Sequence, residues 1–155
     1  MLATWWRKPL WTPDDVDACW ATSPFGTLLV CGHGVDALDL PVEVFDHLDA
    51  TMPETLRTYP SIALPRERRI VLTSGTSAVL HDVMLPPECR WLAGARWVPL
   101  PPTLVSRSVS ATWANPPDGQ LRLPEPDVLV EAIVADYKQG HFMPKGDPGT
   151  AKARV

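Results

Sequence analysis

Two aspartates, Asp36 and Asp39, are the first residues whose type and spacing could do chemistry. They lie in the apolar segment 27–41, and paired carboxylates on one strand are a ligand set for divalent metal ions. The two are an odd number of positions apart, however, and successive side chains of a strand point to opposite faces. We therefore expect the two carboxylates to lie on opposite sides of the strand.

Arginines supply positive charge that could bind phosphate, because the guanidinium group matches phosphate oxygens in a two-pronged geometry. The candidates are Arg66, Arg68, Arg69, Arg90 and Arg96. The alternative is a solvated turn in which Glu67 offsets part of the charge. The net charge of -4 argues against a surface that binds nucleic acid everywhere. A local basic groove is the form that such a site would take.

Tryptophans gather at the amino end beside the basic pair Arg7-Lys8. They are Trp5, Trp6 and Trp11. If exposed, they would stack on single-stranded bases or anchor a protein partner; if buried, they belong to an arm that packs on the core. The tryptophans expected in the core are Trp20, Trp91 and Trp97.

Other reactive residue types lack the partners that their chemistry needs. His81 beside Asp82 resembles a base oriented by a carboxylate, but no Gly-x-Ser-x-Gly nucleophile motif accompanies it. His33 has no partner at metal-ligand spacing, and we expect a turn residue with an unusual φ. The three cysteines, Cys19, Cys31 and Cys89, are scattered without a CxxC pair. The sequence therefore predicts no metal site and no disulfide framework, as in a reduced cytoplasmic protein.

The elements that must position these residues are short. There are 18 prolines in 155 residues, well above the roughly 5% that is usual, so long helices are excluded. Capping and periodicity predict helices from Thr12, over 41–56 and from Pro126 to Gly140. Apolar runs predict a hairpin of 27–31 and 35–40 across Gly32-His33-Gly34. Residues 62–65 are a short apolar piece, and further strands are expected at 70–73, 79–85 and 96–100. The alternation over 104–113 fits a half-exposed strand or an extended arm.

This order of elements predicts an α+β protein, with a mainly antiparallel sheet and helices packed on it. The length fits a single domain over residues 1–140. Residues 141–155 are rich in Gly, Pro and Lys and are expected to form a flexible tail. No apolar run approaches the roughly 18 residues that a membrane crossing needs.

The stretch TLLVCGHGVDALDLP at residues 27–41, followed by RWVPLPPT at 96–103, resembles the primase-polymerase domain of the archaeo-eukaryotic primase superfamily. It is most similar to actinobacterial bifunctional DNA primase/polymerase N-terminal domains. The resemblance covers roughly residues 20–126, and it implies a primase-polymerase-like fold. In that family a glycine-bearing hairpin leads into a strand ending in Asp-x-Asp or Asp-x-Glu. A basic or Gly-rich loop then leads into a strand that carries a His, and a third acid precedes a segment ending in Pro-Pro-Ser.

The departures from the family pattern lie at its metal ligands. Asp39 matches the first acid, but Pro41 stands where the second should be. The family's His corresponds to Arg69, and its third acid falls near Arg90 or Trp91. One carboxylate with guanidinium groups nearby cannot hold the two Mg²⁺ ions that phosphoryl transfer needs, so we expect Asp39 to pair with an arginine.

The resemblance therefore implies a catalytically degenerate domain that binds nucleic acid or nucleotides, or acts as a scaffold, in replication or mobile-element biology. One alternative is an active primase/polymerase in which Asp36, Asp39 and a further acid, Asp82 or Glu88, hold Mg²⁺. Another is a protein-interaction module without a nucleic-acid role.

Overall fold

The computed structural model describes residues 12, 14, 18, 26–75, 84–106, 108–119 and 123–141. The elements follow one another as β1 (Thr27–Val30), β2 (Val35–Pro41), α2 (Val42–Thr51), α3 (Pro53–Leu56), β3 (Ser61–Leu64), β4 (Arg68–Ser74), β5 (Arg90–Leu92), β6 (Trp97–Leu100), β7 (Thr112–Asn115) and α4 (Asp127–Lys138). None of the helices in these ranges is both long and apolar enough to cross a lipid bilayer.

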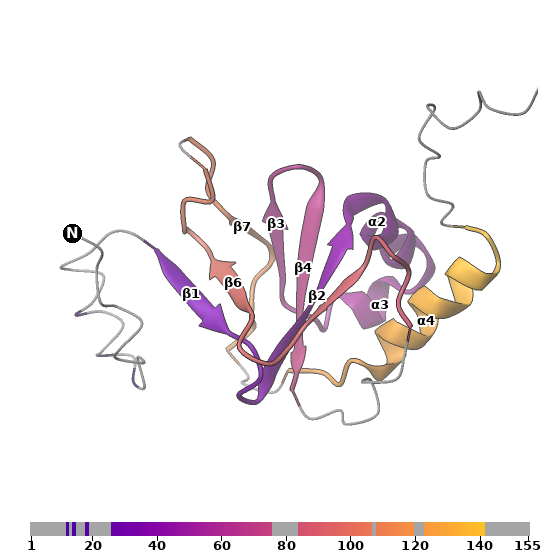
Figure 1. Cartoon of the computed structure of the whole chain (residues 1–155), viewed down its shortest axis with the longest axis horizontal. Helices are drawn as coiled ribbons and strands as arrows, with labels where there is room; N and C mark the ends of the chain where they lie inside the picture. The colour runs from indigo at the N-terminus through magenta and orange to yellow at the C-terminus, as the bar shows by residue number, and fades with distance from the viewer. Residues whose placement is uncertain are drawn as a thin grey trace, which may run out of the picture.

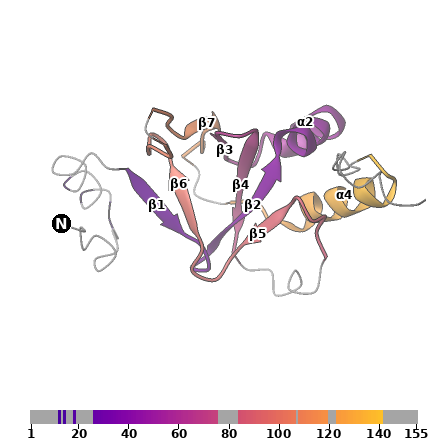
Figure 2. The same cartoon turned by 45° about the horizontal axis from the view of Figure 1, so that its top comes forward.

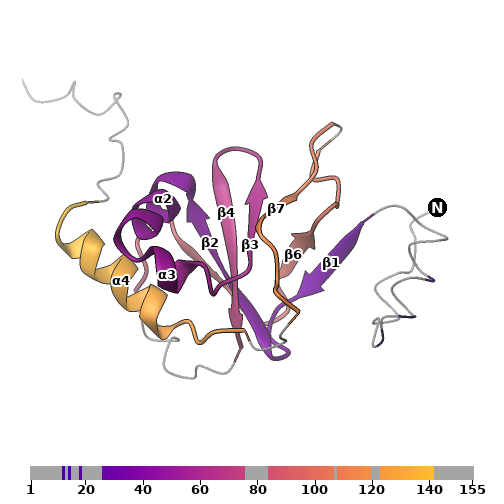
Figure 3. The same ribbon diagram turned by 180° about the vertical axis from the view of Figure 1, so that it is seen from behind.

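The main sheet has five strands in the order β5-β2-β4-β3-β7, and every neighbouring pair is antiparallel. Helices α2, α3 and α4 gather on one side of it, as Figures 1 and 3 show from opposite directions. The short pair β1-β6 forms a second antiparallel sheet. The predicted α+β class with a mainly antiparallel sheet is therefore confirmed.

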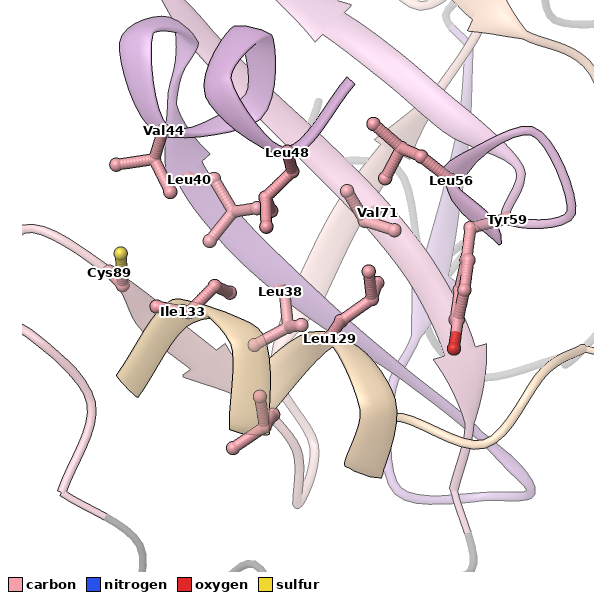
Figure 4. Close-up of a cluster of buried hydrophobic side chains, with 11 residues drawn as sticks. Leu38, Leu40, Val44, Leu48, Leu56, Tyr59, Val71, Cys89, Leu129 and Ile133 are labelled. Carbon is pink, nitrogen blue, oxygen red and sulfur yellow. The ribbon is translucent and has the colours of Figure 1, made fainter. Parts of the chain in front are cut away.

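Each face of the sheet has its own apolar core, because side chains alternate along β2 and β4. Beneath the helices (Figure 4) the buried cluster consists of Leu38, Leu40, Val44, Leu48, Leu56, Tyr59, Val71, Cys89, Leu129, Val130 and Ile133. On the other face, toward β1-β6, it consists of Cys31, Ala37, Ile62, Ile70, Leu72, Val98 and Ala111. Burying a side chain such as leucine or isoleucine contributes about 1.5–3 kcal/mol, so these two layers hold the fold together.

The predicted hairpin of 27–31 with 35–40 is wrong, because its two strands pair with other partners. Strand β1 pairs with β6, and β2 pairs with β4 and β5. Residues 27–40 and 90–100 instead form one long antiparallel ribbon that bends sharply, with β1-β6 on one side of the bend and β2-β5 on the other (Figure 2). At the bend the Cys31 N–H donates to the Arg96 carbonyl and the Ala95 N–H to that of Cys31.

Glycine makes the bend possible. Gly32 has φ +94°, and a Cβ on it would lie 2.9 Å from the Gly94 backbone N. The Asp36 carboxylate closes the turn by accepting a hydrogen bond from the Gly32 N–H at 2.9 Å. The positive φ expected at His33 belongs to its neighbours Gly32 and Gly34 instead. Strands turn corners between sheets in this way where a small residue lets two backbones approach.

The remaining predictions hold in part. The expected helix 41–56 is two helices, since Pro53 begins α3 after a break at Met52. Helix α4 and the strands at 70–73 and 96–100 are confirmed to within a few residues, and the apolar piece at 62–65 forms most of β3. Of the two alternatives for 104–113, a continuous strand is wrong: the chain makes an isolated bridge from Leu104 to Ser110, and β7 begins only at Thr112. Strand β5 was not predicted.

Several predictions concern parts of the chain outside the described residues. They are residues 79–83 of the strand predicted at 79–85, most of the first helix, and all but the first residue of the tail 141–155; Met84 and Leu85 are described and lie in no strand.

A tight turn joins β3 to β4 at the end of the sheet where β2 also ends. Three residues, 65–67, lie between the paired Leu64 and Arg68, and two of them, Arg66 and Glu67, have positive φ, 62° and 57°. The Glu67 carbonyl accepts a hydrogen bond of 2.8 Å from the Val42 N–H, the first of α2. The turn thus satisfies a backbone donor that the helix itself leaves open.

Candidate functional site

Asp39 lies near the end of β2 and pairs with an arginine. The Arg68 Nε lies 2.8 Å from the Asp39 Oδ1, and both side chains are largely buried. The same guanidinium donates through its second and third nitrogens to the carbonyls of Asp39 and Glu88, at 3.0 Å each. The expectation that Asp39 pairs with an arginine is therefore confirmed.

A second arginine faces the same carboxylate position. Arg90 is the residue of β5 directly opposite Asp39, and opposite residues of an antiparallel pair share one face of the sheet. Arg90 is exposed. Asp39 therefore stands between two arginines, one on each neighbouring strand, so its own charge is offset.

Asp36 does not join this group. It pairs across β4 with Thr73, whereas Asp39 is opposite Ile70, and Ile70 and Leu72 belong to the core on the β1-β6 side. By alternation, Asp36 projects toward the opposite face. It is buried, and its Oδ1 accepts the hydrogen bond from Gly32.

The residues present do not fit the paired magnesium ions that the family resemblance implies. Mg²⁺ needs several oxygen ligands at about 2.1 Å in octahedral geometry. One oxygen of Asp39 is bonded to Arg68, the neighbouring strand offers Arg90, and the sheet separates Asp36 from both. Glu88, a candidate third acid, presents its backbone carbonyl to Arg68. Asp82 lies outside the described residues.

The arginine candidates do not form one patch. Arg66, Arg68 and Arg90 gather at the end of the sheet where β2 terminates, and Arg66 and Arg90 are exposed. Arg69 lies on the helix-covered face, with its guanidinium carbon 5.8 Å from the centre of the Phe45 ring. Arg96 is exposed at the bend of the ribbon, at the other end of β5. Three of the five candidates thus remain together.

The Pro101-Pro102-Thr103 segment has a structural role that its motif did not indicate. The Thr103 hydroxyl donates to the Thr27 carbonyl at 2.9 Å and accepts from the Thr27 N–H at 2.8 Å. A Cβ on Gly26 would lie 2.5 Å from the Thr103 hydroxyl oxygen. The threonine therefore fixes the start of β1 against the end of β6.

The tryptophan candidates Trp5, Trp6 and Trp11 lie outside the described residues, as do Trp20 and the pair His81-Asp82. Trp91 packs against the helix-side core, as expected. The prediction that Trp97 is a core residue is wrong, because 47% of it is exposed. It lies on the outer face of the β1-β6 pair, opposite Val30.

The two described cysteines are buried and unpaired with each other. Burial, and then the Asp36 carboxylate, raises the pKa of Cys31 to about 11. Burial, followed by Glu88, raises the pKa of Cys89 to about 11, with nearby Arg68 opposing the shift. Both sulfurs stay protonated at neutral pH, so neither is an activated nucleophile.

One group of chemistry-bearing residues was missed from the sequence. His47 of α2, Asp136 of α4 and His141 just after α4 bring their ligand atoms within 4.8 Å of one another. His47 is far from the other two in sequence, and the Asp136–His141 spacing is not that of neighbours on a helix. The available signal was Gly140, a helix-ending glycine after which the chain folds back.

No protein-family model, curated protein or solved structure matches the chain. The likeness to primase-polymerase domains therefore rests on the residues of segments 27–41 and 96–103 alone.

Proposed function

We propose that this protein is a catalytically inactive, primase-polymerase-like module that binds nucleic acid through phosphate contacts. The observation that carries the proposal is the Arg68–Asp39 pair. In the related domains the matching aspartate would bind a metal ion. Here its charge is offset by a guanidinium that makes three hydrogen bonds.

Loss of the metal site and retention of phosphate binding are compatible in chemical terms. A pocket for nucleotide phosphates needs positive charge, which metal ions supply in active enzymes of this kind. Arginines can supply the same charge directly and form two-pronged hydrogen bonds with phosphate oxygens. Arg66 and Arg90 are the exposed residues at this end of the sheet that are suited to the role.

Salt-dependent binding tests the phosphate contacts. The full chain is titrated against a fluorescently labelled single-stranded oligonucleotide at several salt concentrations. We expect the logarithm of the association constant to fall linearly with the logarithm of salt concentration. The double variant Arg66→Ala/Arg90→Ala should make that slope shallower by about 0.7 for each phosphate that the protein no longer neutralises.

The matched control is Arg57→Ala, which removes an exposed arginine just after α3, paired with Glu54 at the surface. It should leave the slope unchanged. No binding at low salt would overturn the nucleic-acid role and favour a protein partner. A slope that Arg57→Ala reduces as much as the double variant would mean that Arg66 and Arg90 form no site.

A second measurement tests inactivity. Template-dependent nucleotide incorporation is assayed with Mg²⁺ and with Mn²⁺, and we expect no incorporation above a protein-free control. Metal-dependent incorporation that Asp39→Ala abolishes would overturn this part of the proposal and establish the active alternative.

A further inference from the structure

Two histidines and an aspartate meet where α2 lies beside the carboxyl end of α4. The His47 Nε2 lies 3.2 Å from the Asp136 Oδ2, and the His141 Nδ1 lies 3.5 Å from the Asp136 Oδ1. The two imidazole rings are 5.3 Å apart between centroids. All three side chains are partly open to solvent, with exposed fractions of 31%, 18% and 47% in the order His47, Asp136, His141.

The end of α4 brings these residues together. Gly140 has φ +79°, and its N–H donates to the Tyr137 carbonyl while the His141 N–H donates to that of Asp136. This pair of bonds is the Schellman arrangement, which reverses the chain at a helix end. The reversal returns the His141 ring to the side of the helix that carries Asp136. Helix α2 supplies His47 from the other side.

We propose that His47, Asp136 and His141 form a zinc site. Two imidazole nitrogens and one carboxylate oxygen are a ligand set typical of Zn²⁺, with water in the fourth position. Ligand atoms bound at about 2.0–2.1 Å in a tetrahedron lie roughly 3.4 Å from one another. The Asp136 Oδ2 lies 3.2 Å from the His47 nitrogen and the Oδ1 lies 3.5 Å from the His141 nitrogen, each close to that separation. One ligand atom from each of the three residues can be chosen so that all lie within 4.8 Å of one another.

Zinc can reach the site directly from solvent, and its binding would stabilise the folded protein. Because the three ligands are partly exposed, the metal can bind from solvent without unfolding the helices. Because they come from α2 and from the end of α4, the ion would join the two helices and stabilise the folded state. The five-stranded sheet separates this site from Asp39, so it stands independently of the proposed nucleic-acid role.

Calorimetric titration of the full metal-free chain with Zn²⁺ tests the site. We expect saturable binding with one ion per chain and a rise in the thermal unfolding temperature with zinc concentration. Co²⁺ in place of Zn²⁺ should give the visible absorption of a four-coordinate site with nitrogen and oxygen ligands. The variants His141→Ala and His47→Ala should each weaken binding at least ten-fold.

The matched control is His33→Ala, which removes an exposed histidine at the bend of the ribbon. It should bind zinc like the unaltered chain. Since His141 is exposed beyond the end of α4, its variant is expected to fold normally, and its unfolding temperature without metal verifies this. The proposal is overturned if zinc does not saturate the chain at up to millimolar concentration. It is equally overturned if His141→Ala and His47→Ala bind zinc as tightly as His33→Ala.

Discussion

Arg68 joins three strands through one side chain. From β4 it bonds the carboxylate and the carbonyl of Asp39 on β2, and the carbonyl of Glu88 just before β5. Asp39 and Glu88 are both partly shielded from water, so the guanidinium supplies hydrogen bonds that solvent supplies less readily. An arginine at this position therefore stabilises the edge of the sheet while it offsets the charge of Asp39.

Arg68→Ala should lower the free energy of unfolding by roughly 2–3 kcal/mol, because it leaves a partly buried carboxylate without its charged partner. Urea denaturation measures the loss. Arg68→Lys should recover only part of it, since one ammonium cannot reproduce three bonds in a planar geometry. The double variant Arg68→Ala/Asp39→Ala should be more stable than Arg68→Ala alone. If it is not, the ion pair does not carry the effect.

Thr103 offers a second prediction for a single residue. Thr103→Val keeps the shape but removes both hydrogen bonds with Thr27, and it should cost about 1–3 kcal/mol. Thr103→Ser keeps the hydroxyl and should cost less. The exposed Thr112 of β7 gives the control, since Thr112→Val should change the unfolding midpoint little. Equal losses for Thr103→Val and Thr112→Val would contradict the role described.

Among the elements, the bend of the long ribbon depends most on glycine. Gly34→Ala, at φ +87° with open space around it, should cost roughly 1–2 kcal/mol from backbone strain alone. Gly32→Ala carries the same strain and also brings a Cβ to 2.9 Å from the Gly94 backbone. It should cost at least about 1 kcal/mol more. Thermal unfolding of the two variants compares these costs, and equal values would show that the close approach is relieved by small shifts.

In the turn between β3 and β4, one substitution is expected to increase the stability of the protein. Glu67 holds φ 57°, where glycine is free of the Cβ clash, so Glu67→Gly should raise the free energy of unfolding by about 0.5–1 kcal/mol. In the exposed helical position Ala50, the corresponding change Ala50→Gly should instead lower it by about 1 kcal/mol. Opposite signs in chemical denaturation are the expected result. A loss for both variants would contradict the strain argument.

The elements also show how far local sequence determines this fold. Apolar periodicity and capping located α2, α4, β4 and β6, because those signals are local. Pairing is not local. The glycines at 32 and 34 gave the pattern of a hairpin, yet β1 and β2 take their partners from 90–100. Strand β5 is three residues long, too short for a periodic signal.

The candidate site was predicted in part and missed where it depends on packing. The expectation that Asp39 pairs with an arginine came from the family resemblance, which put Arg69 and Arg90 near the positions of metal ligands. The partner of Asp39, Arg68, and the placement of Arg69 on the other face follow from the register between β2 and β4. The cluster of His47, Asp136 and His141 depends on how two helices pack, which no spacing in the sequence expresses.

Across the whole molecule, buried thiols connect stability to pH. The pKa values of Cys31 and Cys89 are raised from 9.0 to about 11, so above pH 9 the unfolded chain releases these protons more readily than the folded one. Stability is therefore fully present below pH 9 and declines as pH rises toward 11. Burial also raises the pKa of Tyr59, and Asp127 and Glu125 add to the shift. Tyr59 therefore also contributes to the loss of stability at high pH.

Chemical denaturation at several pH values between 9 and 11 measures this decline in the free energy of unfolding. The double variant Cys31→Ala/Cys89→Ala, although less stable at neutral pH, should lose less stability between pH 9 and pH 11 than the unaltered chain. Parallel curves would show that the thiols do not titrate differently in the two states. In the folded protein both thiols should also resist alkylating reagents, and they should react once denaturant is added.

The bent ribbon has a consequence for how the chain reaches its native state. Thr27 pairs with Leu100 and Ala37 with Leu92. Neither β1-β6 nor β2-β5 can therefore form until the residues of the later strand have been synthesised. Contacts of such wide sequence separation carry a large entropic cost of loop closure, and they slow folding relative to local helices and hairpins. During synthesis on the ribosome, the β3-β4 hairpin and α2 can therefore form before residues 27–40 find their partner. Until then β1 presents an unpaired apolar edge, which is the stage at which aggregation is most favoured.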